Sequence, residues 1–131
     1  MALKQRLLDL QKSCQRIYRV VNDGLGKNFT LEDLRKLAER VAKEILKFKV
    51  DERELSGPDW EKFQQLDPKL ASDVSYFSRN HDERWAQILL SKVDPERSAS
   101  GDLGGARYEL ELVMRTTGKF IEDLGKLAGR L

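Results

Sequence analysis

Seven basic side chains recur at helical spacing in the first half of the chain, and their chemistry suits phosphate binding. They lie on the expected outer faces of two neighbouring helices: Lys12, Arg16, Arg19, Lys36, Arg40, Lys43 and Lys47. A strip of Lys and Arg that contacts several phosphates binds nucleic acid with strong salt dependence and little sequence preference. Nucleic acid is therefore one candidate partner. The same pattern also suits a solvated bundle face or a complementary acidic protein surface.

Glycines in the last expected helix form a second unusual pattern. Gly118 and Gly125 are seven residues apart, and Gly129 follows four residues later, which places all three near one side of a helix. Each glycine inside a helix costs about 1 kcal/mol relative to alanine. We interpret the three as a candidate helix–helix interface, within the domain or with a partner. The alternative is a helix that bends or frays near Thr116-Thr117-Gly118.

Patterns typical of catalysis, cofactor binding or metal binding are missing from the sequence. His81 is the only histidine and Cys14 the only cysteine, and the residues around His81 support no nucleophile–base pair. One histidine and one cysteine do not make an ordinary structural zinc site. We therefore expect no enzyme, no cofactor and no metal site. His81 itself is expected on the surface near a helix start.

Aromatic residues gather in the middle of the chain. They are Trp60, Phe63, Tyr76, Phe77 and Trp85. At helical spacing aromatic side chains are more often part of a core, and that is the interpretation we favour. If exposed, the same residues would stack on bases or anchor a protein partner.

Three long apolar stripes indicate the helices that carry these groups. Their steps alternate between three and four residues, which keeps a stripe on one face of a helix and is typical of packed helices. The stripes are Leu3, Leu7, Leu10, Cys14, Ile17 and Val21; Leu31, Leu34, Ala38, Val41, Ile45 and Phe48; and Leu103, Ala106, Leu110, Val113, Thr117, Phe120, Leu124, Leu127 and Leu131.

Turn and capping residues divide the chain into helices. The first helix is expected over about 3–22, and the second begins after Thr30, where Asp33 completes a capping box, and reaches about Lys49. Proline residues at 58 and 68 open shorter helices, and a mobile loop is expected over about 94–103 before the last, central helix. The sequence predicts an all-α fold, an antiparallel bundle of four or five helices, as a single domain over residues 1–131.

Composition and charge place the chain among globular proteins with a highly charged surface. Of its 131 residues 40% are hydrophobic and 35% charged. Residues 1–50 hold 12 Lys and Arg against 6 Asp and Glu, whereas residues 51–100 hold 7 against 11. No apolar run approaches the ~18 residues of a membrane span, and no signal peptide is evident, so we expect a cytoplasmic protein that does not bind membranes.

These observations favour binding over chemistry as the function. We expect a small interaction or assembly subunit that binds a protein partner or its own copies as a homo-oligomer. The alternative is a nucleic-acid-binding subunit of a nucleoprotein complex that uses the basic face of the first two helices.

Overall fold

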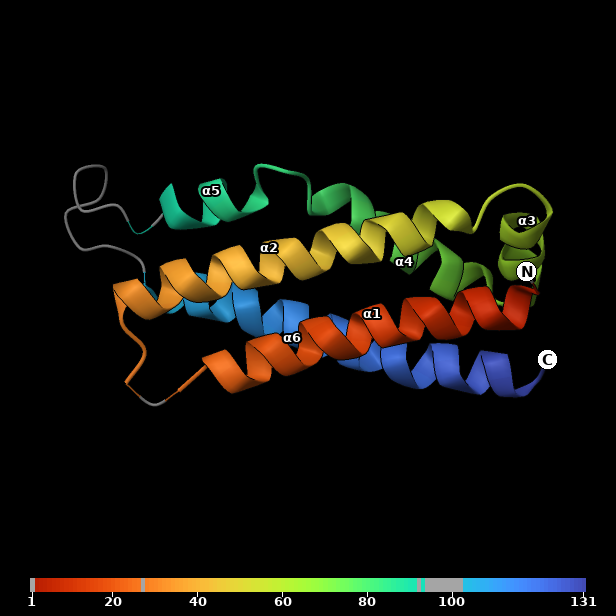
Figure 1. Cartoon of the computed structure of the whole chain (residues 1–131), viewed down its shortest axis with the longest axis horizontal. Coiled ribbons are helices and arrows are strands. Elements are labelled where there is room, and N and C mark those ends of the chain that lie inside the picture. The colour runs from red at the N-terminus through yellow and green to blue at the C-terminus, as the bar shows by residue number, and fades with distance from the viewer. Residues whose placement is uncertain (1, 27, 92, 94–102) are drawn as a thin grey trace.

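A computed structural model of the chain describes residues 2–26, 28–91, 93 and 103–131. Within these ranges it contains six helices and no strand: α1 (Leu3–Gly24), α2 (Leu31–Glu54), α3 (Pro58–Leu66), α4 (Pro68–Asn80), α5 (Trp85–Ser91) and α6 (Leu103–Gly129). The predicted all-α bundle is confirmed (Figure 1). Six described helices form because the middle of the chain divides into three short ones. The loop predicted over about 94–103 lies outside the described residues, except for Leu103 at the start of α6.

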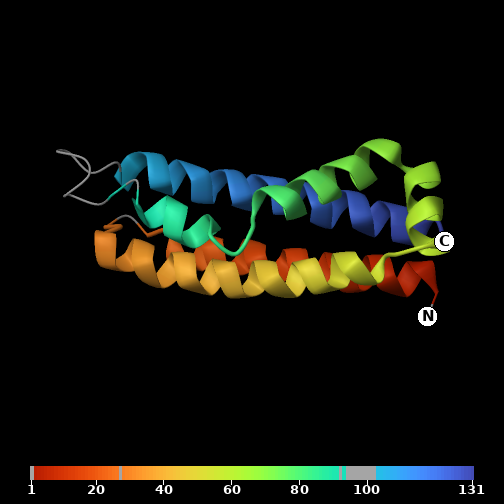
Figure 2. The same cartoon turned by 90° about the horizontal axis from the view of Figure 1, so that it is seen from above.

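The helices lie in two layers. α1 and α2 run antiparallel, side by side, in one layer, α4 and α6 lie in the other, and α5 packs along α2 between the two layers (Figure 2). α6 runs antiparallel to α1, and these two helices make the most extensive packing in the described part of the chain. α3 lies at the end of the bundle where the two termini meet. The outer face of α1 and α2 is thus on the opposite side of the molecule from α4 and α6.

Local interactions fix where the helices begin. The Thr30 side chain accepts a hydrogen bond from the Asp33 amide at 3.1 Å, and the Asp33 carboxylate accepts one from the Thr30 amide at 3.0 Å. This confirms the predicted capping box, which satisfies two backbone donors at the start of α2. Asp67 caps α4 in a similar way, since its carboxylate accepts a hydrogen bond from the Leu70 amide at 3.1 Å. Gly57, with φ 58°, turns the chain into α3.

The three apolar stripes supply the core between the layers. Their members are buried from Leu3 to Val21, from Leu34 to Phe48 and from Ala106 to Leu127. The stripe residues that are not buried stand at helix ends, where neighbouring helices cover less surface: Leu31 and Leu103 are half-buried and Leu131 is exposed.

Thr117 shows how a polar residue fits into this core. It is fully buried, and its hydroxyl donates a hydrogen bond to the Val113 carbonyl oxygen at 2.8 Å. The hydroxyl is therefore satisfied within α6, one turn back, and needs no partner on another helix.

Glycine residues of α6 allow α1 to lie close to it. A methyl group placed on Gly118 would meet the Tyr18 ring at 3.2 Å, and one on Gly125 would meet Nε2 of Gln11 at 2.7 Å. That Gln11 amide donates a hydrogen bond to the Ile121 carbonyl oxygen at 2.9 Å. The cost of these two glycines in the helix is thus offset by contacts with α1.

We expect Gly125→Ala to change the free energy of unfolding by less than about 0.5 kcal/mol, because two effects of about 1 kcal/mol oppose each other. Alanine favours the helix, but its methyl group displaces the Gln11 amide from the Ile121 carbonyl. In a Gln11→Ala background the same substitution should stabilise the protein by about 1 kcal/mol, because no amide is displaced. Urea unfolding of the four proteins measures this. Equal effects of Gly125→Ala in both backgrounds would contradict the prediction.

Candidate functional site

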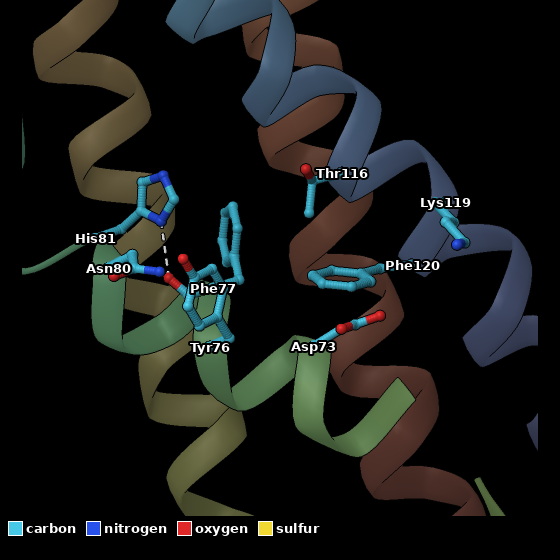
Figure 3. Close-up of a pocket in the computed structure, with 8 residues that line it drawn as sticks. All are labelled: Asp73, Tyr76, Phe77, Asn80, His81, Thr116, Lys119 and Phe120. Atoms are coloured by element: carbon cyan, nitrogen blue, oxygen red, sulfur yellow. Dashed lines mark hydrogen bonds between the residues drawn. The ribbon is translucent and has the colours of Figure 1, made fainter. Parts of the chain in front are cut away.

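A groove runs along α6 where α4 and α5 face it. It consists of two adjoining cavities, one of about 320 Å³ between α4 and α6 and one of about 570 Å³ that continues to α5. Figure 3 looks into the first, with the ribbons of α1 and α2 behind the residues that line it. We call this feature the α4–α6 groove. The residues that line both cavities are Tyr76, Phe77, Asn80, His81 and Thr116.

Large apolar side chains at the groove are exposed to solvent. Tyr76 on α4 is 64% exposed, Ile88 on α5 is 53% exposed, and Leu112 on α6 is 40% exposed. All three line the larger cavity. Exposed apolar groups that converge on a concave surface from three helices are typical of a site that binds another chain.

The floor of the groove is a row of aromatic rings. The Phe77 ring lies edge-on to Phe120 with the ring centroids 5.8 Å apart, and 4.2 Å from the His81 ring. His81 in turn lies 5.4 Å from the Trp85 ring. Because Phe77, Phe120 and Trp85 are buried, this row is anchored in the core and gives the groove a preformed base.

The charged residues that line the groove are mostly acidic. The carboxylates belong to Asp73 on α4, Asp82 after α4, and Glu109 on α6, and Lys119 is the cationic residue among the described lining residues. The groove thus combines exposed apolar groups with a negative charge balance. Its chemistry suits an apolar segment flanked by Lys or Arg.

His81 lies in the wall of the groove, which corrects the expectation of a surface position near a helix start. It follows the last residue of α4, and its Nδ1 is 2.7 Å from the Phe77 carbonyl oxygen (Figure 3). Burial lowers the pKa of His81 below its ordinary value of 6.5, and the charge of Lys49 on α2 acts in the same direction. The Phe77 carbonyl and Glu109 on α6 oppose this shift. The ring is therefore neutral at pH 7.

We expect His81 to make the fold less stable in mild acid. Since its pKa is lower in the folded chain than the ordinary 6.5, the unfolded chain binds the proton more readily. Stability is then complete above about pH 6.5 and falls as the pH decreases through the folded-state pKa. The melting temperature should drop between pH 7 and pH 5.5, and His81→Gln should reduce that drop. An unchanged drop in the variant would show that other groups cause it.

The predicted basic residues all lie exposed on α1 and α2. We call them the basic face: Lys12, Arg16, Arg19, Lys36, Arg40, Lys43 and Lys47. Two of them share one carboxylate, since Glu44 lies 3.4 Å from Arg16 and 3.3 Å from Lys47. The other five make no ion pair within the ranges that the structure describes. The structure thus brings the seven side chains onto neighbouring helices, with Glu44 neutralising part of their charge.

The aromatic residues do not form one cluster. Trp60 and Phe63 pack edge-to-face within α3, with ring centroids 5.5 Å apart, and do not line the α4–α6 groove. Phe77 and Trp85 belong to the groove floor, whereas Tyr76 projects into solvent. The prediction that these aromatic residues belong to the core is therefore confirmed for Phe63, Phe77 and Trp85 and is wrong for Tyr76.

Other candidate groups lie away from the groove. The Cys14 thiol is in the core, where burial and the charge of Asp51 raise its pKa, so it stays protonated. Gly118 and Gly125 contact α1, while Gly129 has open space around it. Among the described residues no group of three His, Cys, Asp or Glu is placed to bind a metal ion. The described helices also include none with the length and apolar character needed to cross a membrane.

Comparisons with known proteins add no functional assignment. Scans of protein-family models, of curated proteins and of solved structures found no match to this chain. The candidate site is therefore defined by its geometry: an apolar, acidic groove on one side of the bundle and a basic face on the other.

Proposed function

We propose that this chain is a non-catalytic subunit that binds a protein partner in the α4–α6 groove. The observation that carries the proposal is the convergence of Tyr76, Ile88 and Leu112, each at least 40% exposed, on a preformed aromatic floor. Apolar anchors around a concave surface are the usual centre of a protein interface. The groove replaces the glycine stripe as the candidate docking surface, because Gly118 and Gly125 are used by α1.

The proposed occupant is an amphipathic helix with basic flanks. An apolar helix face docks in such a groove through residues spaced three and four apart. Asp73 and Asp82 at the groove favour Lys or Arg beside those apolar residues. A non-catalytic role agrees with the reactive groups present, because the Cys14 thiol is in the core and Nδ1 of His81 bonds to a backbone carbonyl.

Two synthetic helical peptides of about 18 residues, or five turns, test this proposal. Both carry the same leucine stripe, but one has lysine flanks and the other glutamate flanks. We expect the lysine peptide to bind more tightly in calorimetric titrations and to shift the NMR methyl signals of Ile88 and Leu112.

A matched pair of variants controls the experiment. Leu112→Ser should weaken binding of the lysine peptide at least tenfold, or about 1.4 kcal/mol. Leu131→Ser should leave it unchanged, because Leu131 is similarly exposed, at 42%, but does not line the groove. If neither peptide binds, or if Leu112→Ser and Leu131→Ser weaken binding of the lysine peptide equally, the groove is refuted as a protein-binding site.

A second candidate function is nucleic-acid binding by the basic face. It is favoured by the five basic side chains that make no ion pair among the described residues. We expect Lys12→Glu with Arg19→Glu to weaken binding of a labelled oligonucleotide at least tenfold and to reduce its salt dependence. Lys62→Glu with Lys69→Glu, on α3 and α4, is the control. Fluorescence anisotropy that shows equal binding by all three proteins would reject this function.

A further inference from the structure

His81 lies where the α4–α6 groove meets the side of α2. It stands in the linker between α4 and α5, and its half-buried ring lines both cavities of the groove. The same residue lines a third cavity, of about 80 Å³, together with Leu46 of α2. The ring packs against Phe77, with the ring centroids 4.2 Å apart, and against Trp85, at 5.4 Å. An occupant of the groove would therefore lie directly against this imidazole.

The hydrogen bond of His81 decides where a further proton is added. Nδ1 is 2.7 Å from the Phe77 carbonyl oxygen, and a carbonyl oxygen can only accept, so Nδ1 carries the proton of the neutral ring (Figure 3). The second proton is therefore added at Nε2. Nδ1 donates in both forms, so protonation keeps the bond to Phe77. The ring stays in the groove wall, and what changes there is its charge.

Charged or titratable groups surround His81 from every neighbouring helix except α5, because Trp85–Ser91 contains none. They are Asp73 and Tyr76 on α4, Asp82 and Glu83 in the linker, Lys49 on α2, and Glu109 and Lys119 on α6. Burial and Lys49 favour the neutral ring, whereas Glu109 favours the charged one. The three carboxylates and the lysine that line the groove give a net charge of −2. A proton on His81 reduces this negative charge by half.

We infer that His81 makes the groove release its partner in mild acid, because a proton on its ring repels the basic flanks of the occupant. This inference rests on the proposed function and adds the regulation of that site. A bound helix would remove water from the imidazole and bring lysine or arginine residues close to it, and both effects disfavour the charged ring. Binding and protonation therefore oppose each other, and by linkage each weakens the other by the same factor.

Calorimetric titration of the lysine peptide at two pH values is the first test. The Kd should rise about threefold or more between about pH 7.5 and about pH 5.0. The preference for lysine over glutamate flanks should shrink over the same range. Circular dichroism checks that the free protein remains folded at the lower pH.

Two variants of neighbouring titratable groups identify the residue responsible. In His81→Gln, the ratio of the Kd values at the two pH values should be close to one, because glutamine keeps a hydrogen-bond donor but does not titrate. Glu83→Gln should retain the ratio of the parent chain, because Glu83 is exposed and lines the cavity against α2 but not the groove.

Proton release on binding is the second test. At about pH 6.0, the lysine peptide should expel part of a proton from the protein. Titrations in phosphate and in Bis-Tris, two buffers with different ionisation enthalpies, should then give different binding enthalpies. The difference gives the number of protons released, and it should be close to the intrinsic difference of the peptide alone, near zero, in His81→Gln.

The outcomes separate this inference from the proposed function. If the lysine peptide binds equally well at both pH values and releases no proton, the inference is wrong and the proposed function stands. If His81→Gln keeps the pH dependence of the parent chain, other groups cause it, and the inference is again wrong. If the peptide does not bind at neutral pH, both are refuted.

Discussion

Phe77→Ala is expected to lower the free energy of unfolding by about 3–5 kcal/mol, the range for a large aromatic residue removed from a core. Phe77 joins three helices. Its ring lies edge-on to Phe48 of α2, at 5.2 Å between centroids, and edge-on to Phe120 of α6, at 5.8 Å. It is 4% exposed, so alanine leaves a cavity where these rings met. The loss removes the main aromatic link between α4 and the rest of the bundle.

Chemical unfolding measures this effect, and the neighbouring residue provides the control. Tyr76 precedes Phe77 in the same helix but is 64% exposed, so Tyr76→Ala should change the free energy of unfolding by less than about 0.5 kcal/mol. Tyr76→Ala should instead weaken binding of the lysine peptide, because Tyr76 lines the groove. A loss below about 1.5 kcal/mol for Phe77→Ala would mean that the aromatic row does not organise the fold.

The bundle was predictable because its core follows a repeating sequence pattern. An apolar step of three or four residues assigns a helix face without knowledge of the partner helix. The start of α2 was predictable for a similar reason, since Thr30 and Asp33 interact within four residues of sequence. The end of α2 was harder to predict. The helix continues to Glu54, about one turn beyond the expected Lys49, because no strong helix breaker precedes Gly57-Pro58.

The groove was not predictable from these patterns, because it depends on the separation between helices. Periodicity indicates that Ile88 and Leu112 lie on helices, but not how closely α5 approaches α6. The same limit applies to His81. Its sequence neighbours are charged, and only the packing of Phe77 and Trp85 around it reveals a half-buried ring. A useful signal was present in Tyr76, which falls outside the apolar stripe of α4 formed by Leu70, Val74 and Phe77.

The arrangement of charge allows both proposed functions to operate together. The basic residues of α1 lie in one layer, and the groove is formed mainly by α4 and α6 of the other. A protein partner in the groove and a polyanion on the basic residues of α1 would therefore be bound on different sides of the molecule. Salt titrations of oligonucleotide binding, with and without the lysine peptide, would separate the two contributions.

The second large effect is expected at a polar contact between α1 and α2. Ser13 is fully buried, and its hydroxyl donates a hydrogen bond to the Asp51 carboxylate. Arg16 donates a hydrogen bond to the Ser13 oxygen at 2.8 Å and lies 3.4 Å from Glu44. These groups connect successive turns of the two antiparallel helices. The contacts to Asp51 and Arg16 satisfy the fully buried Ser13 hydroxyl, and the links between the two helices oppose a shift of one helix along the other.

Asp51→Ala should therefore lower the free energy of unfolding by about 1.5–3 kcal/mol, the range for a hydrogen bond to a charged group. Ser13→Ala should cost less, because the Asp51 carboxylate is only half-buried and regains water. If the two groups act as a pair, the double variant should be more stable than the sum of the single effects implies, by about 1 kcal/mol. Urea unfolding of the four proteins gives this coupling, with Glu39→Ala on the exposed side of α2 as a control. A shared hydrogen bond can be lost only once. If the losses of unfolding free energy in the two single variants add up strictly in the double variant, Ser13 and Asp51 therefore stabilise the α1–α2 pair separately.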